Sequence, residues 1–311
     1  MTTSLGKLRS TSLRVGKPGR GLLAVSPWRK LGAATVDPPP IGLVLPTPPF
    51  GATNGRLWLD TRQTSFMMTD NSGGVTTVGA IEDLFGKARG FSNGDKSGQP
   101  KLGPNGGILF DTDGQTLTSL IRDVVNGLSF ISVYAAFRLD SASYAANSKR
   151  RAVLAVSEAA ATATPPGNGS SQERLAAHLS GGGSGRKPFS SVSIMDGVVA
   201  TTSTTSPAIP SLPSDAKVHA GWEYDLSQAI ASQAIYENGA LVGTATWTPT
   251  ETDKKLNTAD AVTVSLGQRA IPTGVNSGTL FGELFALIVL AEIPDATRRA
   301  QIHTYLNGAI A

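Results

Sequence analysis

Apolar and polar residues alternate in several short stretches between the middle and the end of the chain, as they do in β-strands buried on one face. Residues 128–139 and 218–226 show the pattern most clearly, and residues 262–266 repeat it more briefly. Residues 281–290 are apolar on both faces, which is typical of a covered central strand. The apolar positions that share a face are Ile131, Val133, Ala135, Phe137 and Leu139, and then Val218, Ala220, Trp222, Tyr224 and Leu226.

A hairpin is predicted at residues 233–247, where Asn238-Gly239 separates two β-prone arms. This dipeptide can supply the two positive φ angles of a type I′ turn. The expected cross-strand pairs are Glu237 with Ala240, Tyr236 with Leu241 and Ile235 with Val242. Since both faces of the ribbon then carry apolar groups, we expect the hairpin to lie between layers.

One helix is predicted near the end of the chain. Asp295 can cap its start, Ile302 and Leu306 form an apolar i,i+4 pair, and Gly308 stands where a C′ glycine would end it. Residues 159–171 and 180–185 are rich in Gly, Pro and Ser and are predicted to be loops.

The fold class follows from these elements. Strands separated by turn signals, with almost no helical periodicity between them, favour an all-β antiparallel sandwich over a βαβ fold. The 35 Gly, 19 Pro and 16% charged residues suit strands and turns. We find no short internal repeat, which counts against a propeller or a β-helix.

The net charge of +4 is unevenly distributed. Residues 1–36 contain seven basic residues and no acidic one, which leaves 20 basic against 23 acidic residues in the rest of the chain. We therefore expect a basic N-terminal arm that anchors the protein to a partner through Lys7, Arg9, Arg14, Lys17, Arg20, Trp28, Arg29 and Lys30. Such an arm suits an acidic protein surface or the phosphates of a nucleic acid. The alternative is a disordered, solubilising tail.

The arm is followed by a Pro-rich spacer. Residues 37–49 contain six prolines, whose fixed φ favours a semi-rigid, extended segment. We predict an anchoring arm at 1–36, a spacer at 37–50 and a β-sandwich at 51–311. The only apolar run of the arm is too short for a signal peptide, and no apolar run approaches the roughly 20 residues of a membrane span.

Several motifs in the last third of the chain resemble the closing half of concanavalin A-like, or laminin-G-like, jelly-roll domains. They are the hairpin with its Tyr-x-Asn-Gly sequence at 236–239, the strand at 281–290, and residues 293–306, which end in Tyr305-Leu306. In that family the central strand runs into a short helix that finishes in Tyr-Leu. Here Pro294 and Thr297 replace the usual capping-box residues, and Asp295 is the expected substitute.

The first part of the body resembles the same domains as they occur in tailed-phage fibre, spike and decoration proteins. Its matching stretches are Leu57-Trp-Leu-Asp-Thr61, residues 86–90 and Gly106-Gly-Ile-Leu-Phe-Asp111. The resemblance covers roughly residues 51–308 and implies a jelly-roll sandwich displayed on a virion.

Candidate chemistry centres on the strand at 218–226. Some members of the wider fold are glycoside hydrolases with a Glu-x-Asp-x-Glu strand motif, whereas Glu223-x-Asp225 here lacks the third carboxylate. We therefore expect no catalytic residues and a protein that is not an enzyme. If the polar face is concave, His219, Glu223 and Asp225 can bind sugar hydroxyls, with Trp247 or Tyr236 as a stacking surface. The alternatives are an ordinary solvent face and aromatic residues that serve the core.

Metal and cofactor chemistry find little support. The chain has no Cys, and His178, His219 and His303 lie far apart in the sequence. Asp111 and Asp113 with Gly114 suit either Ca²⁺ or, more simply, a turn. We expect no metal and no cofactor.

The expected function is that of a virion structural protein, assembled in the host cytoplasm, with its arm on capsid or tail proteins and its sandwich bound to a cell-surface polysaccharide. We expect a homo-oligomer or a multi-copy array, because repetition adds avidity, and no membrane partner. Two alternatives are a polysaccharide-degrading glycoside hydrolase that uses Glu223 and Asp225, and a decoration protein without a ligand.

Overall fold

The chain divides into two units, Met1–Leu43 and Val44–Ala311. A computed structural model describes parts of the second unit, namely residues 45–87, 89–120, 124–140, 150–158, 173–182, 185–196, 199–203, 217–248, 254–256, 262–268 and 277–311. The predicted anchoring residues of the arm, most of the spacer and the predicted loop at 159–171 lie outside these ranges.

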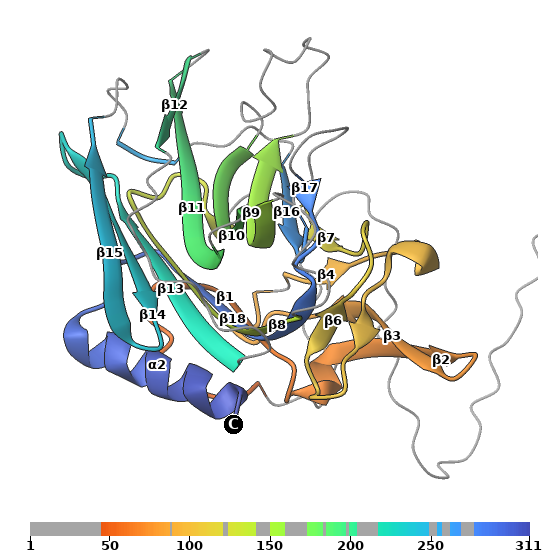
Figure 1. The fold of residues 1–311 in the computed structure, drawn as a ribbon. Coiled ribbons are helices and arrows are strands. Elements are labelled where there is room, and N and C mark those ends of the chain that lie inside the picture. Colours follow the sequence, from red (N-terminus) through yellow and green to blue (C-terminus); the bar gives the residue numbers. More distant parts are fainter. Residues whose placement is uncertain are drawn as a thin grey trace, which may run out of the picture. The chain divides into compact units, whose positions relative to one another are not determined.

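Six antiparallel strands form the first layer of this unit, which we call the helix-side sheet (Figure 1). In spatial order they are β1 (Gly55–Asp60), β18 (Gly282–Leu290), β8 (Phe130–Leu139), β13 (Lys217–Asp225), β14 (Ala231–Glu237) and β15 (Ala240–Trp247). All nine residues of β18 are buried, as predicted for a central strand.

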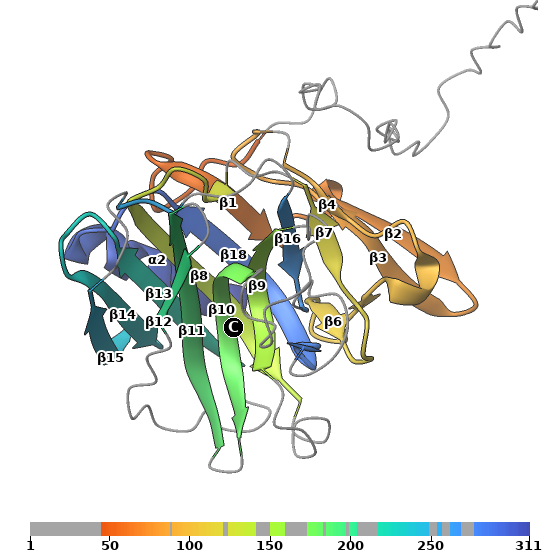
Figure 2. The ribbon, with the colours of Figure 1, turned by 90° about the horizontal axis from the view of Figure 1, so that it is seen from above.

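The second layer, the far sheet, lies across the first (Figure 2). Its antiparallel strands are, in order, β12 (Val199–Ser203), β11 (Gly185–Asp196), β10 (Glu173–Gly182), β9 (Arg150–Glu158), β16 (Val262–Leu266), β7 (Leu117–Ser119), β4 (Phe91–Ser92), β3 (Val75–Ile81) and β2 (Met67–Ser72). Two short strands, β5 (Lys101–Leu102) and β6 (Ile108–Phe110), connect β3 to β18. A further strand, β17 (Ser277–Gly278), runs parallel to β9.

The core lies between the two sheets. It contains the predicted apolar faces of β8 and β13, in which the side chains of Trp222 and Tyr224 are fully buried. Burial of such large aromatic and aliphatic side chains is the main force that holds the sheets together. The predicted all-β antiparallel sandwich is therefore confirmed.

The predicted C-terminal helix is also present, as α2 (Ala296–Ala309), and it covers the outer face of the helix-side sheet over β8, β13 and β18 (Figure 1). Asp295 caps it, since its carboxylate accepts the backbone N–H of Arg298 at 2.8 Å. The predicted end at Gly308 is wrong, because the helix continues to Ala309. Ile310 closes it with φ −111° and an N–H bond to the carbonyl of Asn307, so no left-handed glycine is needed.

The hairpin of β14 and β15 has the predicted type I′ turn, with φ of 48° at Asn238 and 85° at Gly239. Its first two cross-strand pairs are as expected, but a bulge then places Ile235 opposite Gly243. The expectation that the hairpin lies between layers is wrong for β15. Among the strands that the structure describes, β15 is the edge of the helix-side sheet, and Leu241 on it is 54% exposed.

The predicted loop at 180–185 is largely a hairpin. Ser180–Gly182 ends β10 and Gly185 begins β11, with Gly182 paired to Gly185. The glycines that suggested a loop instead allow the chain to reverse between two paired strands. Residues 183 and 184 are outside the described ranges.

Two 3-10 turns complete the described elements, η1 (Thr64–Phe66) and η2 (Lys96–Gly98). Asp95 caps the second, accepting the backbone N–H of Ser97 at 3.0 Å.

Candidate functional site

The four residues predicted to bind sugar do not form one surface. His219 and Glu223 lie on the outer face of β13, which α2 covers rather than leaves open. Asp225 ends β13 and accepts the backbone N–H and the hydroxyl of Ser227, at 2.9 and 2.6 Å, so it shapes the following turn. Trp247 is partly buried against the core, and its indole N–H finds no acceptor among the described residues.

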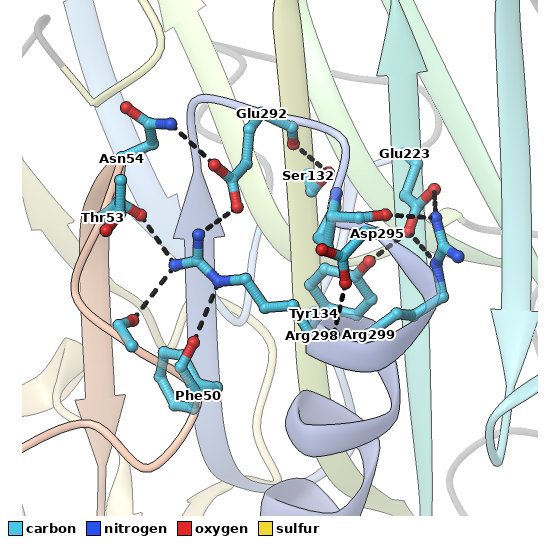
Figure 3. A network of polar contacts seen from close by, with 12 residues as sticks. Phe50, Thr53, Asn54, Ser132, Tyr134, Glu223, Glu292, Asp295, Arg298 and Arg299 are labelled. Carbon is cyan, nitrogen blue, oxygen red and sulfur yellow. Dashed lines mark hydrogen bonds and ion pairs between the residues drawn. The ribbon is translucent and has the colours of Figure 1, made fainter.

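Glu223 is buried beneath the first turn of α2, with 3% of its surface exposed. Arg299 on the helix donates to its two carboxylate oxygens from Nε at 2.6 Å and from Nη2 at 2.9 Å (Figure 3). The hydroxyl of Tyr134, from β8, donates to the same carboxylate. Such charge-assisted, bidentate contacts fix the helix on the sheet. A sugar could reach this carboxylate only by displacing Arg299.

Arg299 makes two further contacts that hold its guanidinium in place. It donates from Nη2 to the carbonyl of Pro294 at 2.8 Å, and its central guanidinium carbon, Cζ, lies 4.8 Å from the ring centroid of Tyr236. The carboxylate of Glu223 raises the pKa of Arg299, and burial together with Glu223 raises the pKa of Tyr134. Both groups therefore keep their protons at neutral pH.

Two histidines that are distant in the sequence meet one helical turn further on. The Nδ1 atoms of His219 and His303 lie 3.1 Å apart, and their ring centroids 5.0 Å apart. Burial lowers the pKa of His303 to about 4, with the charges of His219 and Arg299 adding to the effect, and burial also lowers the pKa of His219. Both rings are therefore neutral at pH 7. One Nδ1 donates its proton to the other, which requires opposite tautomers.

The histidines form one wall of a surface recess of about 500 Å³, which we call the histidine recess. Its lining comes from the start of β13, the β14–β15 turn and the last turns of α2, and consists of Lys217, His219, Asn238, His303, Thr304, Asn307 and Ile310. Asn238 is tied to β13, because its side-chain oxygen accepts the backbone N–H of His219 at 3.1 Å. Nε2 of His303 is buried and has no partner within the described part of the chain.

A second recess, of about 660 Å³, also lies beside α2 and shares Thr304 with the histidine recess. It is lined by Pro49, Ala296, Thr297, Ala300, Gln301, Thr304 and Tyr305. Although larger, it offers no charged side chain. The histidine recess has more groups that can bind a polar ligand, since its lining combines a cation, two imidazoles, two amides and a hydroxyl.

Of the predicted sugar-binding residues, only His219 lines the histidine recess. Sequence reasoning missed Lys217, Asn238, His303, Thr304 and Asn307 as site residues. One signal was present, because Arg299, His303 and Asn307 are spaced four apart and so share a face of α2. A helix that turns such polar residues toward a sheet must provide them with partners, as Glu223 and His219 do here.

Metal-binding groups are scarce in the described ranges, where no cluster of three or more His, Asp or Glu suits a metal ion. Asp111, considered above for Ca²⁺, accepts a hydrogen bond from Lys101 Nζ at 2.7 Å. None of the helices described is long and apolar enough to span a membrane.

No protein-family profile and no curated protein matches the chain. Among solved structures it is similar to the Trypanosoma rangeli sialidase in complex with sialic acid, with 11% identity and a TM-score of 0.47 over 86% of this chain and 35% of that one. It is also similar to the Ruminococcus gnavus IT-sialidase CBM40 bound to α2,3-sialyllactose, with 16% identity and a TM-score of 0.38 over 56% of this chain and 82% of that one. A pentraxin from Limulus polyphemus gives 10% identity and a TM-score of 0.34, over 58% and 71% of the two chains.

These comparisons correct one expectation. From the incomplete carboxylate motif we expected a protein that is not an enzyme, whereas the similar structures include sialidases, one of them described as a covalent intermediate. The missing third carboxylate of the Glu-x-Asp motif is in itself no basis for excluding an enzyme, because that motif belongs to only some glycoside hydrolases. The similarity itself concerns the arrangement of strands, and the chain spans about a third of the sialidase's length.

Proposed function

We propose that the Val44–Ala311 unit recognises a carbohydrate in the histidine recess. The observation that carries this proposal is the convergence of six polar side chains, from three separate elements, on one recess of about 500 Å³. Ligand sites of this size commonly orient their ligand through a few polar groups that point to one place.

The chemistry of the lining suits a sugar. Asn238 and Asn307 offer amide groups and Thr304 offers a hydroxyl, and the neutral imidazole of His219 can donate or accept through Nε2, since its Nδ1 is engaged with His303. A pyranose ring presents hydroxyls with the same dual capacity. Lys217 adds a positive charge at the exposed rim of the recess, so an acidic sugar is the preferred ligand.

We propose further that the unit is displayed on a phage-like particle, to which residues 1–36 anchor it. Two features of the sequence support this. The body resembles jelly-roll domains of tailed-phage fibre and spike proteins, and the arm carries seven basic residues without an acidic one. Neutralising Lys7, Arg9, Arg14, Lys17, Arg20, Arg29 and Lys30 to Gln in the full chain should abolish its binding to particles stripped of the protein. Unchanged binding would contradict the anchoring role.

The sugar proposal is tested by a glycan array that contains neutral and acidic oligosaccharides, probed with the full-length chain. We expect binding to a subset of glycans, weakened by Asn307→Ala and by Lys217→Gln. Gln301→Ala, on the flank of α2 that faces the other recess, is the matched control. Incubation of the bound glycans with the protein, followed by chromatography, measures cleavage in the same experiment. An array without signal would overturn the proposal.

A further inference from the structure

The outer edge of β15 is unusual for a strand at the margin of a sheet. Its eight residues, Ala240-Leu-Val-Gly-Thr-Ala-Thr-Trp247, include no charged residue and no proline. It pairs with β14 on one side, and no strand in the described ranges pairs with it on the other. Natural proteins usually protect such an edge with charges, prolines or a covering segment, because free N–H and C=O groups invite another strand.

The opposite edge of the same sheet shows such protection. There the segment after β3 covers β1, with the N–H of Trp58 bonded to Asp83 at 2.9 Å and the carbonyl of Trp58 accepting the N–H of Leu84 at 2.8 Å. Lys87 donates to the carbonyl of Gly55 at 2.5 Å, and Arg89 donates to that of Arg56. One margin of the helix-side sheet is therefore closed by four contacts, whereas β15 has no comparable cover among the described residues.

The sequence of β15 is suited to pairing with itself. In an antiparallel pair, residues directly opposite each other point to the same face of the sheet. When a strand pairs antiparallel with its own copy, one central residue can lie directly opposite the same residue of the copy. With Thr244 opposite its own copy, Gly243 faces Ala245, and the exposed, β-branched side chains of the two Thr244 residues meet on one face at the centre. The bulge between Leu241 and Gly243 places Leu241 and Trp247 on opposite faces of β15, so these two side chains do not pair.

We propose that two copies of the chain pair antiparallel along β15, with Thr244 opposite Thr244, so that the helix-side sheet continues across the dimer. The partner is a second copy because the strand carries no charge to repel its own copy and because the exposed Thr244 meets an identical β-branched side chain in this register. The inference is independent of the proposed sugar site. Should both hold, the dimer would present two histidine recesses, since Asn238 stands in the turn that leads into β15.

The absence of cysteine from the chain allows a direct test. In the full-length protein, Thr244→Cys brings two thiols together across the proposed symmetry axis, within the 4.4–6.8 Å between Cα atoms that a disulfide typically requires. Mild oxidation should convert most of this variant to a covalent dimer on a non-reducing gel. Thr246→Cys is the register control, because in the proposed register residue 246 lies opposite residue 242 of the other copy, four residues from the second thiol. Gln301→Cys on α2 is the surface control. Both should remain largely monomeric on the gel.

Sedimentation of the unmodified chain gives an independent readout. At tens of micromolar we expect twice the chain mass, and Thr244→Lys, which places two like charges opposite each other, should give the mass of a single chain with unchanged far-UV circular dichroism. A monomeric wild-type chain would overturn the proposal. So would equal cross-linking of the Thr244→Cys and Gln301→Cys variants, or a dimer that Thr244→Lys leaves intact.

Discussion

Arg299 donates two hydrogen bonds, of 2.6 and 2.9 Å, to the carboxylate of Glu223, and so joins the last helix of the chain to a strand 76 residues earlier. Burial makes this pair consequential, because an ion pair removed from water contributes little net stability while intact but is costly when one partner is lost. The pair therefore determines where α2 lies on the sheet.

Replacing Arg299 with Met should destabilise the protein by about 3 to 5 kcal/mol, because the buried carboxylate of Glu223 loses its counter-charge. The double variant Glu223→Gln with Arg299→Met should recover much of that loss, since no buried charge remains. Urea unfolding of the wild type, both single variants and the double variant gives the coupling free energy. A double variant that shows the summed loss of the two single variants would contradict this account.

Arg298, the neighbour of Arg299, holds the segment that leads into β1. It donates to the carbonyls of Phe50, Gly51 and Thr53, at 2.9, 3.1 and 2.7 Å, and also bonds to Glu292 (Figure 3). In Arg298→Ala we expect amide exchange of residues 51–55 to accelerate by about tenfold or more, because these local contacts restrain the opening of that segment. Thr297→Ala is the control on the same helix. Equal exchange in the two variants would show that the contacts with Arg298 are unimportant.

The histidine pair should make stability depend on pH. Burial lowers the pKa of His303 to about 4 from an ordinary value of 6.5, so between these values the unfolded chain binds a proton that the folded chain does not. Stability should therefore fall as the pH is lowered from about 6.5 to 4, by roughly 1 to 3 kcal/mol from this group. In His303→Gln the difference between pH 7.0 and 4.5, measured by urea unfolding, should shrink. An identical pH dependence in the wild type and the variant would refute this role.

Asp83 should make the stability of the protein depend on pH in the opposite direction. Burial raises its pKa to about 6 from an ordinary value of 3.8, although it accepts the N–H groups of Trp58 and Phe85. Between pH 3.8 and 6 the folded chain binds the extra proton, so this contribution to stability is lost as the pH rises through 6. Asp83→Asn cannot ionise and should gain stability relative to the wild type between pH 5.0 and 7.5, by about 1 kcal/mol, since only the interval from pH 5 to 6 falls within the window of the shifted pKa. A constant difference across that range would contradict the assignment.

The main strands, the type I′ hairpin and the cap at Asp295 were predictable from the sequence, because each follows from a local pattern. The alternation in β13 placed Trp222 and Tyr224 in the core, and Asn238-Gly239 specified its own turn. The exposed position of β15 was not predictable, since the sequence pattern of an apolar strand is the same in the middle of a sheet and at its edge. Which neighbour lies beside it depends on contacts across the whole chain.

The candidate site was predictable only in part, for a related reason. His219 was identified from the polar face of β13, but His303 lies 84 residues later, and only the docking of α2 brings the two together. The same docking encloses Glu223, which sequence reasoning had placed on an open face. Without the helix position, a buried ion pair and a solvent-facing carboxylate have the same sequence pattern.

Binding of a glycan to the histidine recess is tested most directly by calorimetric titration of the full-length chain with an acidic oligosaccharide selected on the array. We predict saturable binding to the wild type and to Gln301→Ala, and a loss in affinity of at least tenfold in Asn307→Ala, which leaves the fold and the helix intact. Equal affinities of Asn307→Ala and the wild type would contradict the assignment of the recess as the carbohydrate site.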